Sequence, residues 1–191
     1  MIKKLVLTLG LAVLITACSA PREPQLNLTL QPYSGASSMG QGTAISLETQ
    51  DLRSAQFIAL VDTGREQKQP VHAQQNLRVA FEQALTRQLT AQGYVVSDNS
   101  RGTMRVDILD TLLNVRHSVM KHEMEATANV QVVVESPRGK FVKRFTGRSS
   151  ASGMTSASVE DMEVIVNDLL NNVLAEIGND RELNVYILEN L

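Results

Sequence analysis

The stretch that decides the fold is residues 121–152, KHEMEATANVQVVVESPRGKFVKRFTGRSSAS. Small or apolar residues occupy every second position from Met124 to Val134, and mostly polar residues stand between them. This alternation is typical of a β-strand with one face in the core. Residues 136–139, Ser-Pro-Arg-Gly, suit a type I turn. The stretch therefore predicts two long antiparallel strands, 121–135 and 140–152.

The turn also predicts the register of this hairpin. If Glu135 faces Lys140, the apolar face stays continuous, because Val134 meets Phe141, Val130 meets Phe145, Ala128 meets Gly147 and Ala126 meets Ser149. A shift by one residue would turn both phenylalanines to water, and burying such a side chain is worth about 1.5–3 kcal/mol. We predict the first register, with Lys143 as an inward residue that escapes at the sheet edge.

A helix is expected to pack on the small residues of this face, namely Ala126, Ala128, Gly147, Ser149 and Ala151. Ser158 and Asp161 form a capping-box-like start for that helix. Its broad apolar face runs from position 159 to 177, and Gly178 is expected to end it. Asn179 with Glu182 then begins a shorter helix that reaches the C-terminus.

The preceding part of the chain predicts two short strands, 44–48 and 56–61, and a helix over 75–92. Pro70, in the polar stretch 62–73, argues against a central strand there. The helix has apolar residues four apart, at positions 77, 81, 85 and 89, and Gly93 suits its end. After a short strand at 94–96, a long strand spans 103–115. Its apolar face changes near Asp110, so either a bulge re-aims the strand or both faces are covered.

Together these elements predict an α+β fold. We expect a two-layer sandwich, in which one mainly antiparallel twisted sheet of about 5–6 strands carries two main helices on one face and a short C-terminal helix. Residues 44–191 form a single domain in this interpretation. Residues 18–43, rich in Pro, Gly and Ser, form a flexible tether. Within it, residues 26–30, LNLTL, alternate, and the sequence leaves open whether they join the sheet.

The N-terminus predicts secretion. Lys3 and Lys4 precede an apolar run at 5–15 that is too short to span a hydrocarbon core of about 30 Å, so residues 1–17 are a cleavable signal peptide. The closing Ile-Thr-Ala-Cys at 15–18 resembles the lipobox of bacterial lipoproteins. That resemblance implies diacylglycerol on the sulfur of Cys18 and an acyl chain, such as palmitate, on its amino group. Ser19 in place of aspartate implies, by the usual sorting rule, the outer membrane.

Composition excludes several function classes. Without residues 1–17 the chain has 16 basic and 20 acidic residues, a net charge near −4, and it lacks the clustered basic footprint that nucleic-acid binding needs. Cys18 is the only cysteine, so acylation leaves no thiol for disulfides, thiolate catalysis or a cysteine metal site.

Catalytic patterns are weak. Gly40-Gln41-Gly42 lacks the third glycine and the context of a dinucleotide site. His117 and His122, with Glu123, flank one predicted turn, but zinc needs three or four ligands, and a solvated hairpin explains them better. His72 is interpreted as a loop residue, and none of the serines (149, 150, 152, 156 and 158) lies in a G-x-S-x-G elbow. We therefore predict no catalytic, cofactor-binding or metal site, and no enzyme.

Several segments resemble one family over nearly the whole mature chain. The lipobox, Gln50-Asp51-Leu52-Arg53, Asn76-Leu77-Arg78, and residues 85–94, LTRQLTAQGY, are similar to the YajG-type lipoproteins of Gram-negative bacteria. The resemblance implies the topology and a location in the outer membrane, and it implies no catalytic residues. Family members typically have Arg before the Gly-Tyr, where this chain has Gln92, and we expect this difference to be silent.

Two functional hypotheses follow. In the first, the protein is a membrane-anchored, non-enzymatic accessory or interaction module of the cell envelope, facing the periplasm, with Leu109, Leu112 and Leu113 as a candidate surface for an envelope protein. In the alternative, it binds a small apolar ligand or lipid between sheet and helices. The small-residue face argues against this, because a close helix leaves little volume. A third hypothesis is that the protein is an envelope hydrolase.

Overall fold

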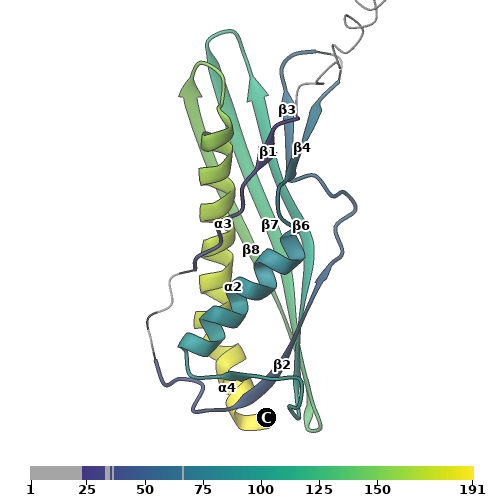
Figure 1. The fold of residues 1–191 in the computed structure, drawn as a ribbon, viewed down its shortest axis with the longest axis vertical. Coiled ribbons are helices and arrows are strands. Elements are labelled where there is room, and N and C mark those ends of the chain that lie inside the picture. Colours follow the sequence, from purple (N-terminus) through teal and green to yellow (C-terminus); the bar gives the residue numbers. More distant parts are fainter. Residues whose placement is uncertain (1–22, 33–34, 36, 66) are drawn as a thin grey trace, which may run out of the picture.

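The computed structural model describes residues 23–191 except 33, 34, 36 and 66. Its strands are β1 (Gln25–Leu26), β2 (Ala44–Asp51), β3 (Ala59–Asp62), β4 (Gln69–Ala73), β5 (Val95–Val96), β6 (Thr103–His117), β7 (Lys121–Ser136) and β8 (Gly139–Met154). Its helices are α2 (Leu77–Ala91), α3 (Val159–Asn179) and α4 (Arg181–Asn190). Figure 1 shows the long strands β6, β7 and β8 running the length of the molecule beside α3.

The register predicted for the β7–β8 hairpin is confirmed. Glu135 pairs with Lys140, Val134 with Phe141, Val130 with Phe145, Ala128 with Gly147, and Ala126 with Ser149. The expected helix, α3, packs on the small-residue face. A Cβ atom added to Gly147 would lie 2.7 Å from both Leu169 Cδ1 and Val173 Cγ2. The small residues therefore do allow the close approach of the helix to the sheet.

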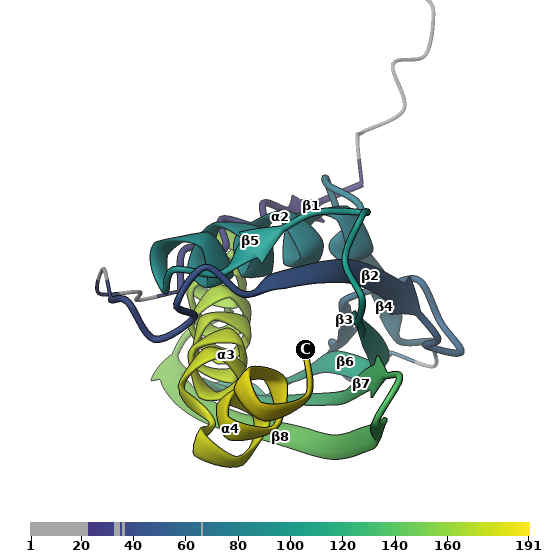
Figure 2. The ribbon, with the colours of Figure 1, turned by 90° about the horizontal axis from the view of Figure 1, so that it is seen from below.

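The sheet is mixed and curled, so the prediction of a mainly antiparallel two-layer sandwich is wrong, although the α+β class holds. β2 and β3 both pair in parallel with β6, β5 pairs in parallel with β2, and β1 with β4. The pairs β3–β4, β6–β7 and β7–β8 are antiparallel. Seen end-on in Figure 2, the sheet curves from β2 through β6 to β8 like half a barrel, with α3 across its open side.

A bulge in β6 explains the change of partner along this strand. The β6–β7 register shifts between Ile108 and Asp110, which leaves Leu109 as the extra residue and confirms the bulge alternative. Before it, β6 pairs with β2 as far as Ile108, and beyond it β6 pairs with β3 from Leu113. The bulge therefore lies where one parallel neighbour ends and the other begins.

The elements follow the sequence signals with two exceptions, one at a helix end and one in a loop. Gly93 has a φ of 87° after α2, as expected, and Ser158 and Asp161 form the capping box of α3. Gly178, however, lies inside α3, which ends at Asn179, because it faces α2: a Cβ there would overlap the Gln88 amide. The stretch 62–73 also contains a strand, β4. Pro70 is tolerated because β1 pairs only with His72 and Ala73, beyond it.

Candidate functional site

The predicted lipidation site, Cys18, lies outside the described residues, which begin at Glu23. No helix in the described part of the chain is long and apolar enough to cross a membrane. The features that bear on function are therefore the segment that leads from the anchor, the polar contacts of the family motifs, the histidines, the free sheet edge and the surface grooves.

Residues 26–30 pack on the domain, which answers the question that the sequence left open: Leu26 joins the sheet in β1, and the rest of the stretch docks without forming a strand. Leu26, Leu28 and Leu30 are 0%, 6% and 4% exposed. Each such burial is worth about 1.5–3 kcal/mol, which offsets much of the entropy cost of ordering this short segment. Farther on, Gly40 donates its N–H to the Gln92 carbonyl, so the Gly40-Gln41-Gly42 segment is a turn packed on the end of α2.

Side chains of α3 supply the hydrogen bonds that a neighbouring strand would give to this segment. Every second N–H of the segment donates to an oxygen on every fourth residue of the helix: Asn27 to Glu163 (2.7 Å), Thr29 to Asn167 (2.8 Å) and Gln31 to Asn171 (2.7 Å). Two residues of extended chain advance about 6.6 Å and four helical residues about 6 Å, so the two spacings match. Asn167 also donates to the Asn27 carbonyl at 3.0 Å.

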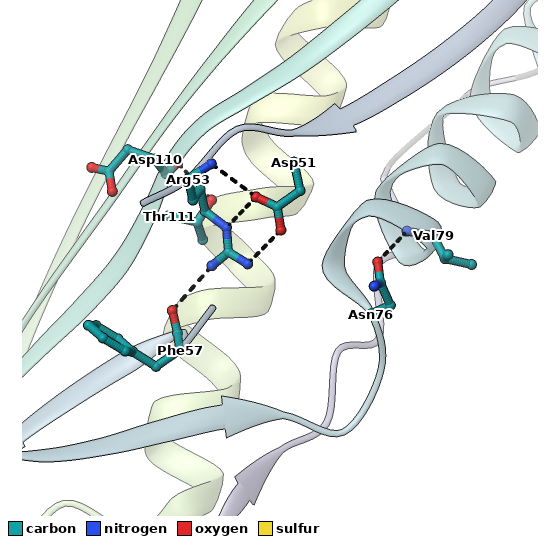
Figure 3. Close-up of polar contacts among 7 residues, drawn as sticks. All are labelled: Asp51, Arg53, Phe57, Asn76, Val79, Asp110 and Thr111. Carbon is teal, nitrogen blue, oxygen red and sulfur yellow. Dashed lines mark hydrogen bonds and ion pairs between the residues drawn. The ribbon is translucent and has the colours of Figure 1, made fainter. Parts of the chain in front are cut away.

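The first family motif contains a shielded ion pair (Figure 3). Arg53 donates from Nε and Nη2 to the two carboxylate oxygens of Asp51, at 2.9 and 2.8 Å, and from Nη1 to the carbonyl of Phe57 at 3.2 Å. The two side chains are only 5% and 13% exposed. Burial by itself raises the pKa of Asp51, but the hydrogen bonds and charge of Arg53 outweigh it and hold this pKa below 3.8. The pair fixes the loop between β2 and β3.

The other motif residues also have structural roles. Asn76 is the N-cap of α2 and accepts the N–H of Val79 at 3.3 Å (Figure 3). Gln92, at the position where we expected a silent change, is 3% exposed and donates to the carbonyl of Gly178 at 2.9 Å. This residue joins the end of α2 to the end of α3, and the expectation that glutamine replaces arginine here without effect stays a prediction.

The two hairpin histidines hold the segment that leads from β8 to α3. His117 Nε2 accepts the N–H of Ala157 at 3.3 Å, and His122 Nδ1 lies 3.1 Å from the carbonyl oxygen of Thr155. Their rings are 6.4 Å apart. In the described ranges, no three side chains of His, Cys, Asp or Glu gather as a metal site would require. The solvated hairpin that we expected is thus partly wrong, because His122 is buried and both rings have backbone partners.

The predicted catalytic candidates do not come together. Ser152 is opposite Glu123 in the hairpin, so it lies on the other face of the sheet from His122. His72, interpreted as a loop residue, lies in β4, far along the sheet from the serines. Ser158 uses its hydroxyl in the capping box of α3, where it accepts the N–H of Asp161 at 3.1 Å. The hydroxyl of Ser158 therefore caps a helix, and the imidazoles of His117 and His122 hold a loop.

The predicted leucine surface is wrong in part. Leu113 is fully buried in the core, because it faces Ala126 and Ala59 within the curled sheet. Leu109 and Leu112 are half-buried on β6, next to the bulge. Sequence alternation could not separate the two faces here, because the extra residue at the bulge reverses the pattern.

The free edge of β8 offers a more open surface. Among the described strands β8 pairs only with β7, so the other edge of this 16-residue strand has unpaired backbone groups. Exposed residues on it include Val142, Arg144 and Arg148. The side chain of Lys143 points inward, and its ammonium group emerges at this edge, as predicted. It pairs with Asp180 and Glu182, both at 2.7 Å, and these hydrogen bonds raise the pKa of the Lys143 ammonium.

One groove is large enough for an apolar molecule. A cavity of about 480 Å³ lies between the β3–β4 pair, the start of α3 and the chain at Glu23 and Pro24. Its lining is mainly apolar, with Val61, Pro70, Val71, Val159 and Met162. The groove lies beside the sheet-helix interface, and the interface itself is filled at Gly147.

The comparisons with known proteins agree with this architecture. A protein family described as uncharacterized lipoprotein matches residues 31–188. The chain belongs to this family. The uncharacterized lipoproteins YajG of Escherichia coli K12 and of E. coli O6:H1 are each 24% identical to it over 194 residues, covering 100% of this chain and 99% of theirs. The resemblance drawn from the motifs is confirmed.

A solved structure shares the fold of this family member. The crystal structure of protein XCC0632 from Xanthomonas campestris superposes with a TM-score of 0.56 at 12% identity, covering 87% of this chain and 94% of the other. At such identity the likeness shows the fold alone. The curled sheet with helices across its open side is therefore not peculiar to this lipoprotein family.

Proposed function

We propose that the protein is a non-enzymatic lipoprotein of the outer membrane, anchored through a triacylated Cys18, with its domain facing the periplasm. The observation that carries the proposal is the signal peptide closing on Ile-Thr-Ala-Cys in a chain that belongs to a lipoprotein family. Two lipid signals suffice for stable anchoring, and three chains exceed that.

Mass spectrometry of the protein purified from cell membranes tests the anchor. The N-terminal peptide should begin at Cys18 and carry diacylglycerol and an N-acyl chain, and density-gradient fractionation should place the protein with outer-membrane markers. A Cys18→Ser variant should keep its leader and lose both lipids. An unmodified Cys18 in the native protein would refute the proposal.

The role that we propose for the domain is contact with another envelope component through the free edge of β8. The unpaired backbone and the exposed Val142, Arg144 and Arg148 support this role. A photo-crosslinking residue at Arg144 in intact cells should capture one reproducible envelope protein. The same residue at Val164, exposed on the outer side of α3, is the matched control. Equal capture at both positions, or none at either, would contradict the assignment.

Binding of a small apolar ligand is a second candidate, supported by the groove near Val71 and Val159. Its volume of about 480 Å³ falls within the range of ligand pockets. A fluorescent fatty acid should bind the purified protein, and Val159→Trp should abolish binding by filling the groove. Val164→Trp, elsewhere on α3, should leave it unchanged. A probe that binds both variants equally would exclude the groove.

A further inference from the structure

The three most exposed large apolar side chains of the described chain lie together at one end. Val119, Met120 and Met154 are 102%, 81% and 87% exposed. Val119 and Met120 form the turn between β6 and β7, and Met154 pairs with Lys121 beside them. The turn is closed by Ser118, which donates its N–H to the Lys121 carbonyl at 2.8 Å. A small, well-formed turn thus presents apolar side chains outward, which in soluble proteins marks a contact surface.

The same end of the molecule holds the start of the described chain. Glu23 lies two residues before Gln25, and the register of the sheet places Gln25 beside His72, Pro70 beside Leu60, and Leu60 beside Asn114. Glu23 is therefore level with Asn114, five residues below Val119 on β6. Figure 1 shows the β3–β4 and β6–β7 loops at this end, with α4 and the C-terminus at the other.

The length of chain outside the structure limits how far the turn can stand from the anchor. Val119 lies about 16 Å beyond the level of Glu23, at about 3.3 Å per strand residue. The five residues from Cys18 to Glu23 span at most about 18 Å when fully extended. As a coil they average about 12 Å. An acylated Cys18 can thus reach only about 2 Å beyond the level of the turn when the chain is fully extended, and it lies below that level as a coil. An upright domain therefore brings the turn to the lipid surface.

We infer that the turn at Val119 and Met120, with Met154 beside it, inserts into the lipid interface of the membrane that holds the anchor. The domain then stands upright, with α4 pointing away from the bilayer. The inference rests on the proposed acylation of Cys18. Arg116 and Lys121 flank the turn and share one carboxylate, Glu123, at 3.5 and 2.6 Å, so these three side chains together carry one positive charge. Such cations suit anionic headgroups.

Depth-dependent fluorescence quenching tests the insertion. The full-length lipidated protein is purified from membranes and reconstituted into vesicles of phosphatidylethanolamine and phosphatidylglycerol. A Met120→Cys variant carries an environment-sensitive dye, since acylated Cys18 has no thiol to compete. Spin-labelled lipids with the label near the headgroups should quench this dye about threefold more than the same dye at Val142→Cys, since interfacial insertion reaches about 5–10 Å. Val142 is half-exposed on β8 near the other end.

The outcomes separate this inference from the proposed function. Vesicle-bound protein with equal quenching at both sites would overturn the insertion and leave the anchor standing. A blue-shifted but unquenched dye at position 120 would indicate a protein cover, such as a second copy of this chain, and would overturn it also. Protein that does not stay with the vesicles would refute the anchor itself. If the dye at 120 disturbs the fold by circular dichroism, Val119→Cys takes its place with the same expected quenching.

Discussion

The β6–β7–β8 region and the region before it, residues 23–96, are held together in different ways. The first consists of long strands adjacent in sequence, with one apolar face that packs on α3. The second consists of short strands, several in parallel pairs with distant partners. Its positions depend on individual polar contacts, such as Asp51 with Arg53 and Thr29 with Asn167.

This difference predicts which substitutions should lower the stability of the protein. An alternating apolar face distributes its free energy over many side chains, so most single substitutions on its outer side should be tolerated. A shielded polar contact concentrates its effect, because removing one partner leaves the other unsatisfied. The region before β6 should therefore depend more on a few polar residues than the hairpin region does.

The largest effect is expected from Arg53→Met. The substitution leaves the shielded Asp51 carboxylate without its cation and should lower the free energy of unfolding by about 3 kcal/mol. Urea unfolding followed by circular dichroism measures the loss. Combining it with Asp51→Asn removes the unpaired charge and should recover much of the stability. If the double variant is no more stable than Arg53→Met alone, the unpaired Asp51 carboxylate does not cause the loss of stability.

In the hairpin region, single substitutions should lower stability only where α3 packs on the sheet. Gly147→Val places atoms within the contact with Leu169 and Val173 and should cost about 2 kcal/mol through overpacking. Ser150→Val introduces the same side chain on the exposed side of β8 and is the matched control. Similar unfolding midpoints for the two variants would show that the close approach of α3 is unimportant.

A smaller effect is expected where α3 holds the N-terminal segment. Asn167→Ala removes an acceptor for the Thr29 N–H and a donor to the Asn27 carbonyl, and should cost about 1–2 kcal/mol. Amide hydrogen exchange should show faster exchange at Thr29. The exposed Asn172→Ala, also on α3, controls for the change in helix propensity. Unchanged exchange at Thr29 would mean that the segment is held without this residue.

The smallest effect concerns pH. Because the pKa of Asp51 is below 3.8 in the folded protein, its contribution to stability is complete above that value and is lost as the pH falls through the lower, folded pKa. Urea midpoints should therefore decline below about pH 4. Asp51→Asn should flatten this decline, whereas Asp62→Asn, on the more exposed Lys68 pair, should alter it little.

The sequence predicted the hairpin region well because its information is local. The turn at 136–139 and the two phenylalanines were enough to give the register, and small residues such as Gly147 indicated where α3 packs. The parallel pairs of β2 and β3 with β6 could not be predicted, because the local sequence of a strand does not specify which distant strand it pairs with.

The candidate surfaces were harder to predict for a similar reason. The bulge at Leu109 reversed the faces of β6, so Leu113 was assigned to the surface although it lies in the core. The docking of residues 26–30 had a further signal in the sequence: Glu163, Asn167 and Asn171 form a polar row at spacing four on α3. Such a row suggests an extended partner, although it does not say which one.

The contact between the N-terminal segment and α3 has a mechanical consequence. The three hydrogen bonds to α3 lie side by side along the segment, so a pull on the N-terminus along its axis loads them together, in shear. Bonds loaded in this way resist more force than bonds that open one after another. Tension on the N-terminus would thus reach the β1–β4 pairing first and then pass to the longest helix through these three bonds.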